Sequence, residues 1–230
     1  MRKTLIYALL LGIKTFSRIF YRFDISWAGS LPKDPWADLR LILILNHTSL
    51  YEPLFVGWVP NRFLKHVAGN GLVPIADKTY NRPLVGRFFR MVAQNVISIS
   101  RLRDISWDRF IDRIRPDSLV IMLPEGRMKR QNGLDANGNP MTIRGGVADL
   151  LEAIPSGRML IAYSGGLHHV QIPSQLIPRL FKTLRMRVES LDVSHYKHML
   201  WHSRGSKSFK QAVVTDLENR LRINCPDGYC

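Results

Sequence analysis

The stretch Leu39-Arg40-Leu41-Ile42-Leu43-Ile44-Leu45 is a nearly continuous apolar run of strand length. Such runs are typical of strands that are buried on both faces, as in a largely parallel sheet. A weaker alternation from Asp24 to Leu31 predicts an edge strand. Three later runs also predict buried strands: Val96-Ile97-Ser98-Ile99, Leu119-Val120-Ile121-Met122-Leu123 and Met159-Leu160-Ile161-Ala162-Tyr163.

Helical patterns lie between these strands and after them. They cover Pro53–Trp58, Pro83–Ala93, Trp107–Ile114, Val147–Ile154 and a closing segment Ser206–Leu221. Because strands that alternate with helices are the mark of α/β proteins, the sequence predicts an α/β domain with a mostly parallel sheet.

Polar side chains follow three of the predicted strands directly. His47 comes after the first long strand, Arg101 after the second and Glu125 after the third. In open α/β sheets ligands bind beyond the carboxyl ends of the strands. These positions therefore predict a functional site at that edge.

His47 and Glu52 have the chemistry of a base and the group that orients it. A histidine can accept a proton from an alcohol, and a carboxylate can fix its tautomer. Five positions on an ideal helix separate two side chains by about 140°, so the two residues meet only if the chain turns between them. Pro53 favours such a turn, since proline suits the first helical position. The alternative is a capping box, with Ser49 as N-cap and Glu52 as its partner.

The turn Leu123-Pro124-Glu125-Gly126-Arg127-Met128-Lys129-Arg130 combines a flexible backbone with three cations. Gly126 permits a tight path, and arginine can hold a phosphate with two hydrogen bonds. The turn therefore predicts a phosphate contact. A solvated basic turn is the alternative.

Several kinds of chemistry have no support in the sequence. There is no Gly-x-Ser-x-Gly elbow, no Walker loop and no Gly-x-Gly-x-x-Gly. His168-His169 and His195 have no carboxylates or cysteines in metal-binding spacing, and the two cysteines, Cys225 and Cys230, could at most close a small loop. A histidine base without an obvious protein nucleophile indicates direct transfer to an acceptor hydroxyl, with no metal.

The charge balance is strongly basic: 33 Lys and Arg face 18 Asp and Glu in 230 residues, a formal net charge of +15. Such a field attracts polyanions. Nucleic acid, an anionic membrane leaflet and a phosphorylated substrate or carrier all fit. No nucleic-acid-binding motif accompanies the charge.

Residues 1–23 predict an amphipathic helix at a membrane interface. At 3.6 residues per turn one side is apolar and the other is basic, as in helices that lie on anionic membranes. The apolar run is too short to span a bilayer and has no signal-peptide cleavage site. A helix packed on the protein's own core is the alternative. The apolar side comprises Leu5, Ile6, Leu9, Ile13, Phe16 and Phe20, and the basic side comprises Lys3, Lys14, Arg18 and Arg22.

These blocks together resemble the glycerophospholipid acyltransferase superfamily, whose first motif is Asn-His, four residues and Asp. Asn46-His47 and Glu52 match it, with Glu in place of Asp. Val96 to Arg101 resembles the second motif, and Pro124-Glu125-Gly126 resembles the core of Phe-Pro-Glu-Gly-Thr-Arg. Arg127 then stands where Thr is usual. Arg144-Gly145 resembles the step that opens the next helix, whereas the proline of the fourth motif is absent near Leu160 to Gly165.

The resemblance implies a glycerolipid acyltransferase-like fold: a mostly parallel mixed sheet flanked by helices, with the N-terminal helix at residues 1–23 and the catalytic domain at 24–230. It implies acyl transfer from acyl-CoA or acyl carrier protein (ACP), with no cofactor, to a lysophospholipid hydroxyl. The implied partners are the acceptor, the donor and an anionic membrane surface on the cytoplasmic face of the inner membrane. His47 would be the general base and Glu52 would orient it. The implied acceptor pocket comprises Asn46, Arg101, Pro124, Glu125, Gly126, Arg127, Arg144 and Gly145. A different lipid acceptor and a non-catalytic lipid-binding role remain open.

Overall fold

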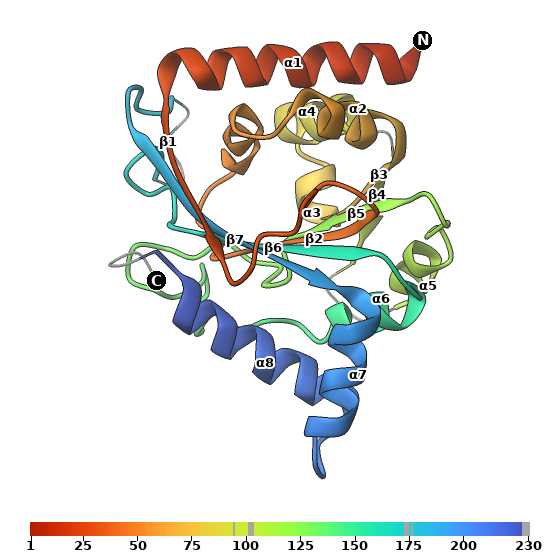
Figure 1. Ribbon diagram of the computed structural model, residues 1–230. Helices are drawn as coiled ribbons and strands as arrows, with labels where there is room; N and C mark the ends of the chain where they lie inside the picture. The colour runs from red at the N-terminus through yellow and green to blue at the C-terminus, as the bar shows by residue number, and fades with distance from the viewer. Residues whose placement is uncertain (94, 101–103, 173–174, 176, 227–230) are drawn as a thin grey trace. The chain divides into compact units, whose positions relative to one another are not determined.

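The computed structural model describes residues 1–93, 95–100, 104–172, 175 and 177–226 (Figure 1). The chain forms two compact units. The first unit comprises Met1–Ile19 and Leu54–Met122, and the second comprises Phe20–Pro53 and Leu123–Cys230. Each unit combines parallel strands with helices, so the α/β class predicted from the sequence is confirmed.

The second unit contributes four strands to a seven-stranded sheet, in the order β1 (Arg22–Ala28), β7 (Thr183–Asp192), β6 (Arg158–Ser164) and β2 (Leu39–Leu45). β1 pairs with β7 and β2 with β6 in parallel, whereas β6 and β7 run antiparallel. The apolar run that predicted β2 is the core of this sheet, since Leu41, Leu43 and Leu45 are completely buried. The sheet is therefore mixed and mostly parallel, as expected.

Three helices belong to the second unit: α6 (Gly146–Ala153), α7 (Val193–Ser203) and α8 (Phe209–Asn224). Figure 1 shows all three on one side of the sheet. α8 begins with a capping box between Ser208 and Gln211, which satisfies the first free N–H groups of the helix. Further along, Arg220 donates to Glu189 of β7 over 2.6 Å and to Asp216 over 2.7 Å. This network holds α8 against the sheet.

The first unit contributes three parallel strands to the sheet, in the order β5 (Leu119–Met122), β3 (Gly71–Ala76) and β4 (Asn95–Ile99). The helices of this unit are α2 (Asn61–Asn70), α3 (Asp77–Tyr80), α4 (Pro83–Val92) and α5 (Ile105–Ile111), and the 3-10 helix η1 (Glu52–Gly57) leads into it along the chain. β3 is not among the strands predicted from the sequence, because Pro74 and Gly71 argue against a central strand. Among the described residues, β5 pairs with β3 only at Gly71 and Leu72, so Pro74 lies beyond that ladder.

The N-terminal helix α1 (Arg2–Phe20) packs on the first unit through a stripe that combines Ile6 of the expected apolar side with Lys14 of the expected basic side. Ile6, Leu10, Lys14 and Ser17 are its buried residues. Nζ of Lys14 donates to the carbonyl of Val59 over 2.7 Å and to Oδ1 of Asn61 over 2.6 Å. The prediction that Lys14 faces solvent is therefore wrong, because buried backbone and amide oxygens hold its ammonium. Arg22 belongs to β1 and not to the helix.

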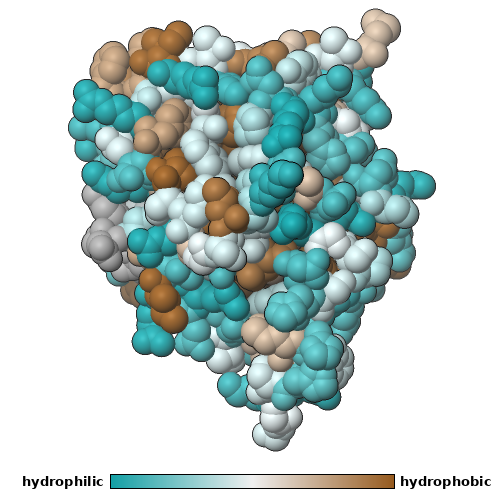
Figure 2. Space-filling view, in the orientation of Figure 1, coloured by the Kyte–Doolittle hydropathy of each residue, from teal (hydrophilic) through white to brown (hydrophobic). Residues whose placement is uncertain are grey.

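The opposite side of α1 remains exposed and apolar. Leu5 is 61% exposed, Phe16 40% and Ile19 63%. Apolar side chains accordingly appear in Figure 2 along the upper edge, where Figure 1 places α1. No helix within the described residues has both the length and the apolar character needed to cross a bilayer.

Candidate functional site

His47 and Glu52 meet in the turn that follows β2. Nδ1 of His47 lies 2.9 Å from Oε1 of Glu52. A carboxylate only accepts hydrogen bonds, so this contact places a hydrogen on Nδ1 and leaves the lone pair of the neutral ring on Nε2. His47 is 15% exposed and Glu52 6%. The structure thus contains a histidine that is oriented by a buried acid and retains contact with solvent.

The same oxygen of Glu52 also fixes the backbone of the turn. Oε1 accepts the backbone N–H of Thr48 over 3.2 Å and that of Ser49 over 3.1 Å. The contact from Ser49 is one half of the capping box considered from the sequence, and η1 begins at Glu52. Capping and orientation are therefore not alternatives, because one carboxylate oxygen performs both.

Asn46 adopts a left-handed backbone, with φ of 65°, directly before His47. Few residues other than glycine and asparagine accept this conformation. Its side-chain Nδ2 donates to the carbonyl of Ser164 over 2.8 Å, and its backbone N–H donates to Oε1 of Glu125 over 2.6 Å. Two contacts from distant parts of the chain thus hold the bend that directs His47.

One carboxylate oxygen of Glu125 is hydrogen-bonded, and the other has no hydrogen-bond partner among the described residues. Oε1 accepts from Asn46, whereas Oε2 is buried and has no hydrogen-bond partner among the described residues. The side chain is only 4% exposed. Burial raises the pKa of the Glu125 carboxyl above its ordinary value, and the N–H of Asn46 and nearby His47 offset this only in part. An unpaired buried oxygen is costly, so Oε2 is a candidate acceptor for a substrate hydroxyl.

The charge around His47 favours its protonated form. Burial by itself lowers the pKa of His47, but the Glu52 carboxylate, its hydrogen bond and the more distant Glu125 outweigh that effect. The pKa of His47 therefore lies above the ordinary value of 6.5. The ring is consequently a stronger base than free imidazole.

The segment that follows β6 supports the turn from the other side. Oγ1 of Thr48 accepts the backbone N–H of Leu167 over 2.7 Å, and Oγ of Ser49 donates to Oε1 of the buried Gln171 over 2.6 Å. Gly166 lies in this segment with a φ of 73°, a backbone conformation that favours glycine. Both hydroxyls of the turn are thus engaged in holding the chain.

Arg127 is paired within its own loop. One of its terminal nitrogens, Nη1, donates to Oδ2 of the buried Asp135. The pKa of Asp135 falls to about 2, chiefly because the backbone N–H of Asn139 donates to it, with further contributions from Asn137 and Arg127. The guanidinium of Arg127 therefore forms an ion pair with the carboxylate of Asp135.

Arg144 offers a cation beside the Glu125–Gly126 turn. Its backbone N–H donates to the carbonyl of Pro124 over 3.0 Å, and its Nε would lie 3.8 Å from a Cβ on Gly126. Gly126 has a φ of 63°, a conformation that favours glycine. The Arg144 side chain is exposed. Arg144 is therefore better placed than Arg127 to meet an anion at this turn.

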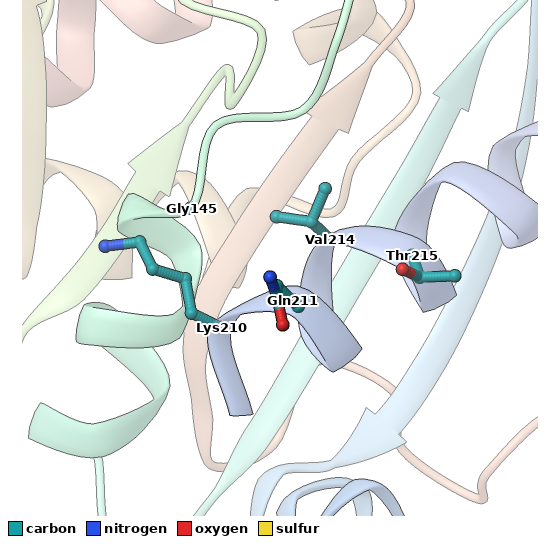
Figure 3. Close-up of a pocket in the computed structure, with 5 residues that line it drawn as sticks. All are labelled: Gly145, Lys210, Gln211, Val214 and Thr215. Carbon is teal, nitrogen blue, oxygen red and sulfur yellow. The ribbon is translucent and has the colours of Figure 1, made fainter. Parts of the chain in front are cut away.

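Gly145, the N-cap residue of α6, lines a pocket of about 300 Å³ with four residues of α8: Lys210, Gln211, Val214 and Thr215 (Figure 3). A Cβ on Gly145 would lie 2.2 Å from Cε of Lys210, so a larger residue at this position would require the Lys210 side chain to move. His47, Glu52 and Glu125 are not among the residues that line the pocket. Gly145 thus contributes to helix packing and to a separate hollow.

The structure brings together most of the residues that the sequence singled out. Asn46 with Glu125 and His47 with Glu52 form two hydrogen-bonded pairs, which the peptide bond between Asn46 and His47 joins. Arg101 lies outside the described residues, as does Cys230, whereas Cys225 is disulfide-bonded and its sulfur lies 3.9 Å from Nδ2 of Asn46. Within the described ranges, no three His, Cys, Asp or Glu side chains are grouped as metal ligands.

Sequence reasoning missed three supporting groups: the carbonyl of Ser164, Gln171 and Asp135. None of them stands in a recognisable motif. The only local signal is the pair Gly165-Gly166 at the end of β6, which indicates a close backbone approach without identifying its partner.

Comparison with known proteins identifies the family and a similar fold. The sequence model of the Acyltransferase family matches residues 30–164, more than half of the chain. Among solved structures, the chain is similar to the 1-acyl-sn-glycerophosphate (LPA) acyltransferase PlsC from Thermotoga maritima, with 17% sequence identity and a TM-score of 0.52. That match covers 99% of this chain and 85% of the other. No curated protein matches.

Proposed function

We infer that this chain, which belongs to the acyltransferase family, transfers a fatty acyl group from acyl-CoA or acyl-ACP to a hydroxyl of a lysophospholipid such as lysophosphatidic acid. The observation that carries this proposal is the 2.9 Å contact between His47 and Glu52. It leaves Nε2 of a partly exposed histidine available to an acceptor.

In the proposed mechanism, Nε2 of His47 removes the proton from the acceptor hydroxyl as its oxygen attacks the thioester carbonyl. Glu52 keeps the hydrogen on Nδ1 and stabilises the imidazolium that forms. When the tetrahedral intermediate collapses, the C–S bond breaks and the thiol sulfur takes the proton from His47. The acceptor gains an ester, the donor leaves as a free thiol, and His47 returns to its neutral form.

Two observations favour direct transfer over a covalent acyl-enzyme. The hydroxyl hydrogen of Ser49 is directed to Gln171, and Oγ1 of Thr48 is occupied by the N–H of Leu167. Neither hydroxyl has a contact to His47 of the kind that a nucleophile and its base require.

The acceptor is proposed to bind across the turn at Pro124, Glu125 and Gly126. The exposed Arg144 would contact the phosphate of lysophosphatidic acid, whose single free hydroxyl is the nucleophile. In an acceptor with a further hydroxyl in its head group, Oε2 of Glu125 would accept that hydroxyl. Arg127 would support this turn through Asp135 and not touch the phosphate. Arg101 remains a proposed phosphate contact on the strength of the motif alone.

The exposed apolar stripe of α1 is proposed to lie on the anionic cytoplasmic face of the inner membrane, where the acceptor resides. Phe16 lies about three turns after Leu5, and Ile19 follows three residues later, so the three side chains share one side of the helix. The basic charge of the chain suits an anionic leaflet. Residues 1–23 would thus be the membrane-interface element of a catalytic domain at 24–230.

The chemistry is tested by a transfer assay with a labelled acyl thioester and lysophosphatidic acid. His47→Ala should abolish transfer, whereas His195→Ala, which removes an exposed histidine from α7, should leave it unchanged. Full activity in His47→Ala would refute the proposed base.

Donor and acceptor are identified by running acyl-CoA and acyl-ACP against a panel of lysophospholipids. Preference for lysophosphatidic acid supports the stated acceptor. A different lipid acceptor is the second candidate. The departure from the usual motif favours it, because Arg127 stands where Thr is usual and its pair with Asp135 alters the turn that would hold the acceptor. Specific lipid binding without transfer from either thioester would indicate a non-catalytic member.

The membrane proposal is tested by sedimentation with anionic vesicles. The triple variant Leu5→Gln, Phe16→Gln, Ile19→Gln should lose most binding, since it removes the exposed stripe without touching the buried side of α1. The matched control replaces two other exposed apolar residues, Ile105→Gln and Ile223→Gln. Equal binding by both variants would refute the role of α1.

A further inference from the structure

Two histidines on α7 face each other across one turn of the helix. Nε2 of His198 lies 2.9 Å from Nε2 of His202. The ring centroids are 4.2 Å apart and the ring planes are inclined by 54°. Both side chains are exposed, and the two residues are separated by four positions, the spacing that puts side chains on one helix face.

The contact requires one ring to donate and the other to accept. An imidazole nitrogen that accepts a hydrogen bond carries a lone pair, so the accepting ring is neutral. The two nitrogens therefore share a single hydrogen in a position exposed to solvent. A metal ion could replace that hydrogen and take a lone pair from each ring.

The separation of the two nitrogens indicates a coordination geometry. With metal–nitrogen bonds of about 2.05 Å, two ligands at a right angle are about 2.9 Å apart, whereas two tetrahedral ligands are about 3.4 Å apart. The observed 2.9 Å is the normal length of the hydrogen bond between the rings, and it is also compatible with two ligands at a right angle without moving the nitrogens apart. Right-angled nitrogen ligands are found in the tetragonal sites of Cu²⁺ and Ni²⁺, and imidazole suits both ions.

We propose that His198 and His202 form a surface site for a divalent transition-metal ion, with Cu²⁺ bound more tightly than Ni²⁺. Water completes the coordination, since no group of three metal-ligating side chains occurs in the part of the chain that the structure describes. Paired histidines at i and i+4 are an established way for a helix to present two ligands to one ion. The site is independent of the acyl-transfer proposal, because no hydrogen bond of the His47 group involves α7 among the contacts described.

The proposal is tested by calorimetric titration of the full chain with Cu²⁺ and with Ni²⁺, together with Cu²⁺ electron paramagnetic resonance. The wild type should bind one equivalent, and its spectrum should show coupling to two nitrogens. His198→Ala and His202→Ala should each weaken binding at least about tenfold, since even the loss of an outer partner of a metal ligand costs about 10–100-fold.

The matched control is His195→Ala, which removes a third exposed histidine of the same helix and should bind like the wild type. Saturating metal should also raise the Tm of the wild type and of His195→Ala, and leave the Tm of the other two variants nearly unchanged. Wild-type affinity in both His198→Ala and His202→Ala would overturn the proposal. An equal loss in His195→Ala would overturn the assignment to two histidines.

Discussion

The backbone N–H of Asn46 donates to Oε1 of Glu125 over 2.6 Å, so the residue before His47 is held by the acid of the Leu123–Gly126 turn. Glu125 also helps to raise the pKa of His47. One carboxyl thereby influences both the direction of the histidine and its basicity, while its second oxygen remains without a partner in the described structure.

The pH dependence of acyl transfer should follow the protonation of His47. A general base must be neutral, and the pKa of His47 is raised, so kcat/KM should increase with pH up to a value above 6.5. Glu52→Gln removes the nearest anion and should move the profile to lower pH, while it reduces kcat by on the order of 10⁴-fold, as in comparable triads. Measuring kcat/KM as a function of pH for the wild type and for Glu52→Gln checks this prediction. An unshifted profile in Glu52→Gln would contradict the role of Glu52.

Substitutions of Glu125 should separate its charge from its hydrogen bond. Glu125→Gln can still accept the N–H of Asn46 but removes the charge, so the pH profile should move to lower pH while the Tm changes little. Glu125→Ala leaves that buried N–H unsatisfied and should cost about 1–3 kcal/mol of unfolding free energy in addition. Chemical denaturation beside the transfer assay measures both effects. Identical stability of the two variants would argue against the hydrogen bond as a structural support.

Substitutions of Asn46 should reveal the cost of its backbone conformation. Asn46→Gly and Asn46→Ala both lose the bond to the Ser164 carbonyl, but only alanine is strained at a φ of 65°. Asn46→Ala should therefore be less stable than Asn46→Gly by about 1–2 kcal/mol. Urea unfolding of the two variants provides the comparison, and equal midpoints would mean that the bend relaxes when the side chain is lost.

Lys14 should be a stabilising residue and not a membrane contact. Lys14→Met removes the donor to the Val59 carbonyl and to Asn61, which should cost about 1–3 kcal/mol, since both acceptors lose a charged partner. Lys3→Met, at an exposed position of the same helix, should change stability by less than about 0.5 kcal/mol. Thermal unfolding measures the difference. Loss of vesicle binding in Lys14→Met at unchanged Tm would reverse this assignment.

Local sequence patterns predicted the strands whose burial is continuous along the chain. The run Leu39–Leu45 is β2 residue for residue. The run Leu119–Leu123 extends one residue beyond β5, and Met159–Tyr163 is one residue shorter than β6 at each end. β7 was missed although Leu184, Met186 and Val188 alternate with half-exposed residues. Without β7 the antiparallel pair that makes the sheet mixed could not be derived from periodicity.

For the site, the sequence by itself determined the residue types and the turn: His47 after a buried strand, Glu52 five positions later and Pro53 to start a helix. These are local properties, because hydrophobic period and proline geometry act over a few residues. Only the tertiary structure decided that one oxygen of Glu52 serves both His47 and the turn, that Arg127 is bound to Asp135, and that Lys14 is buried. In each case a charged side chain is paired with particular hydrogen-bonding groups. Which groups lie within hydrogen-bond distance depends on how the chain folds in three dimensions and not on position along the sequence.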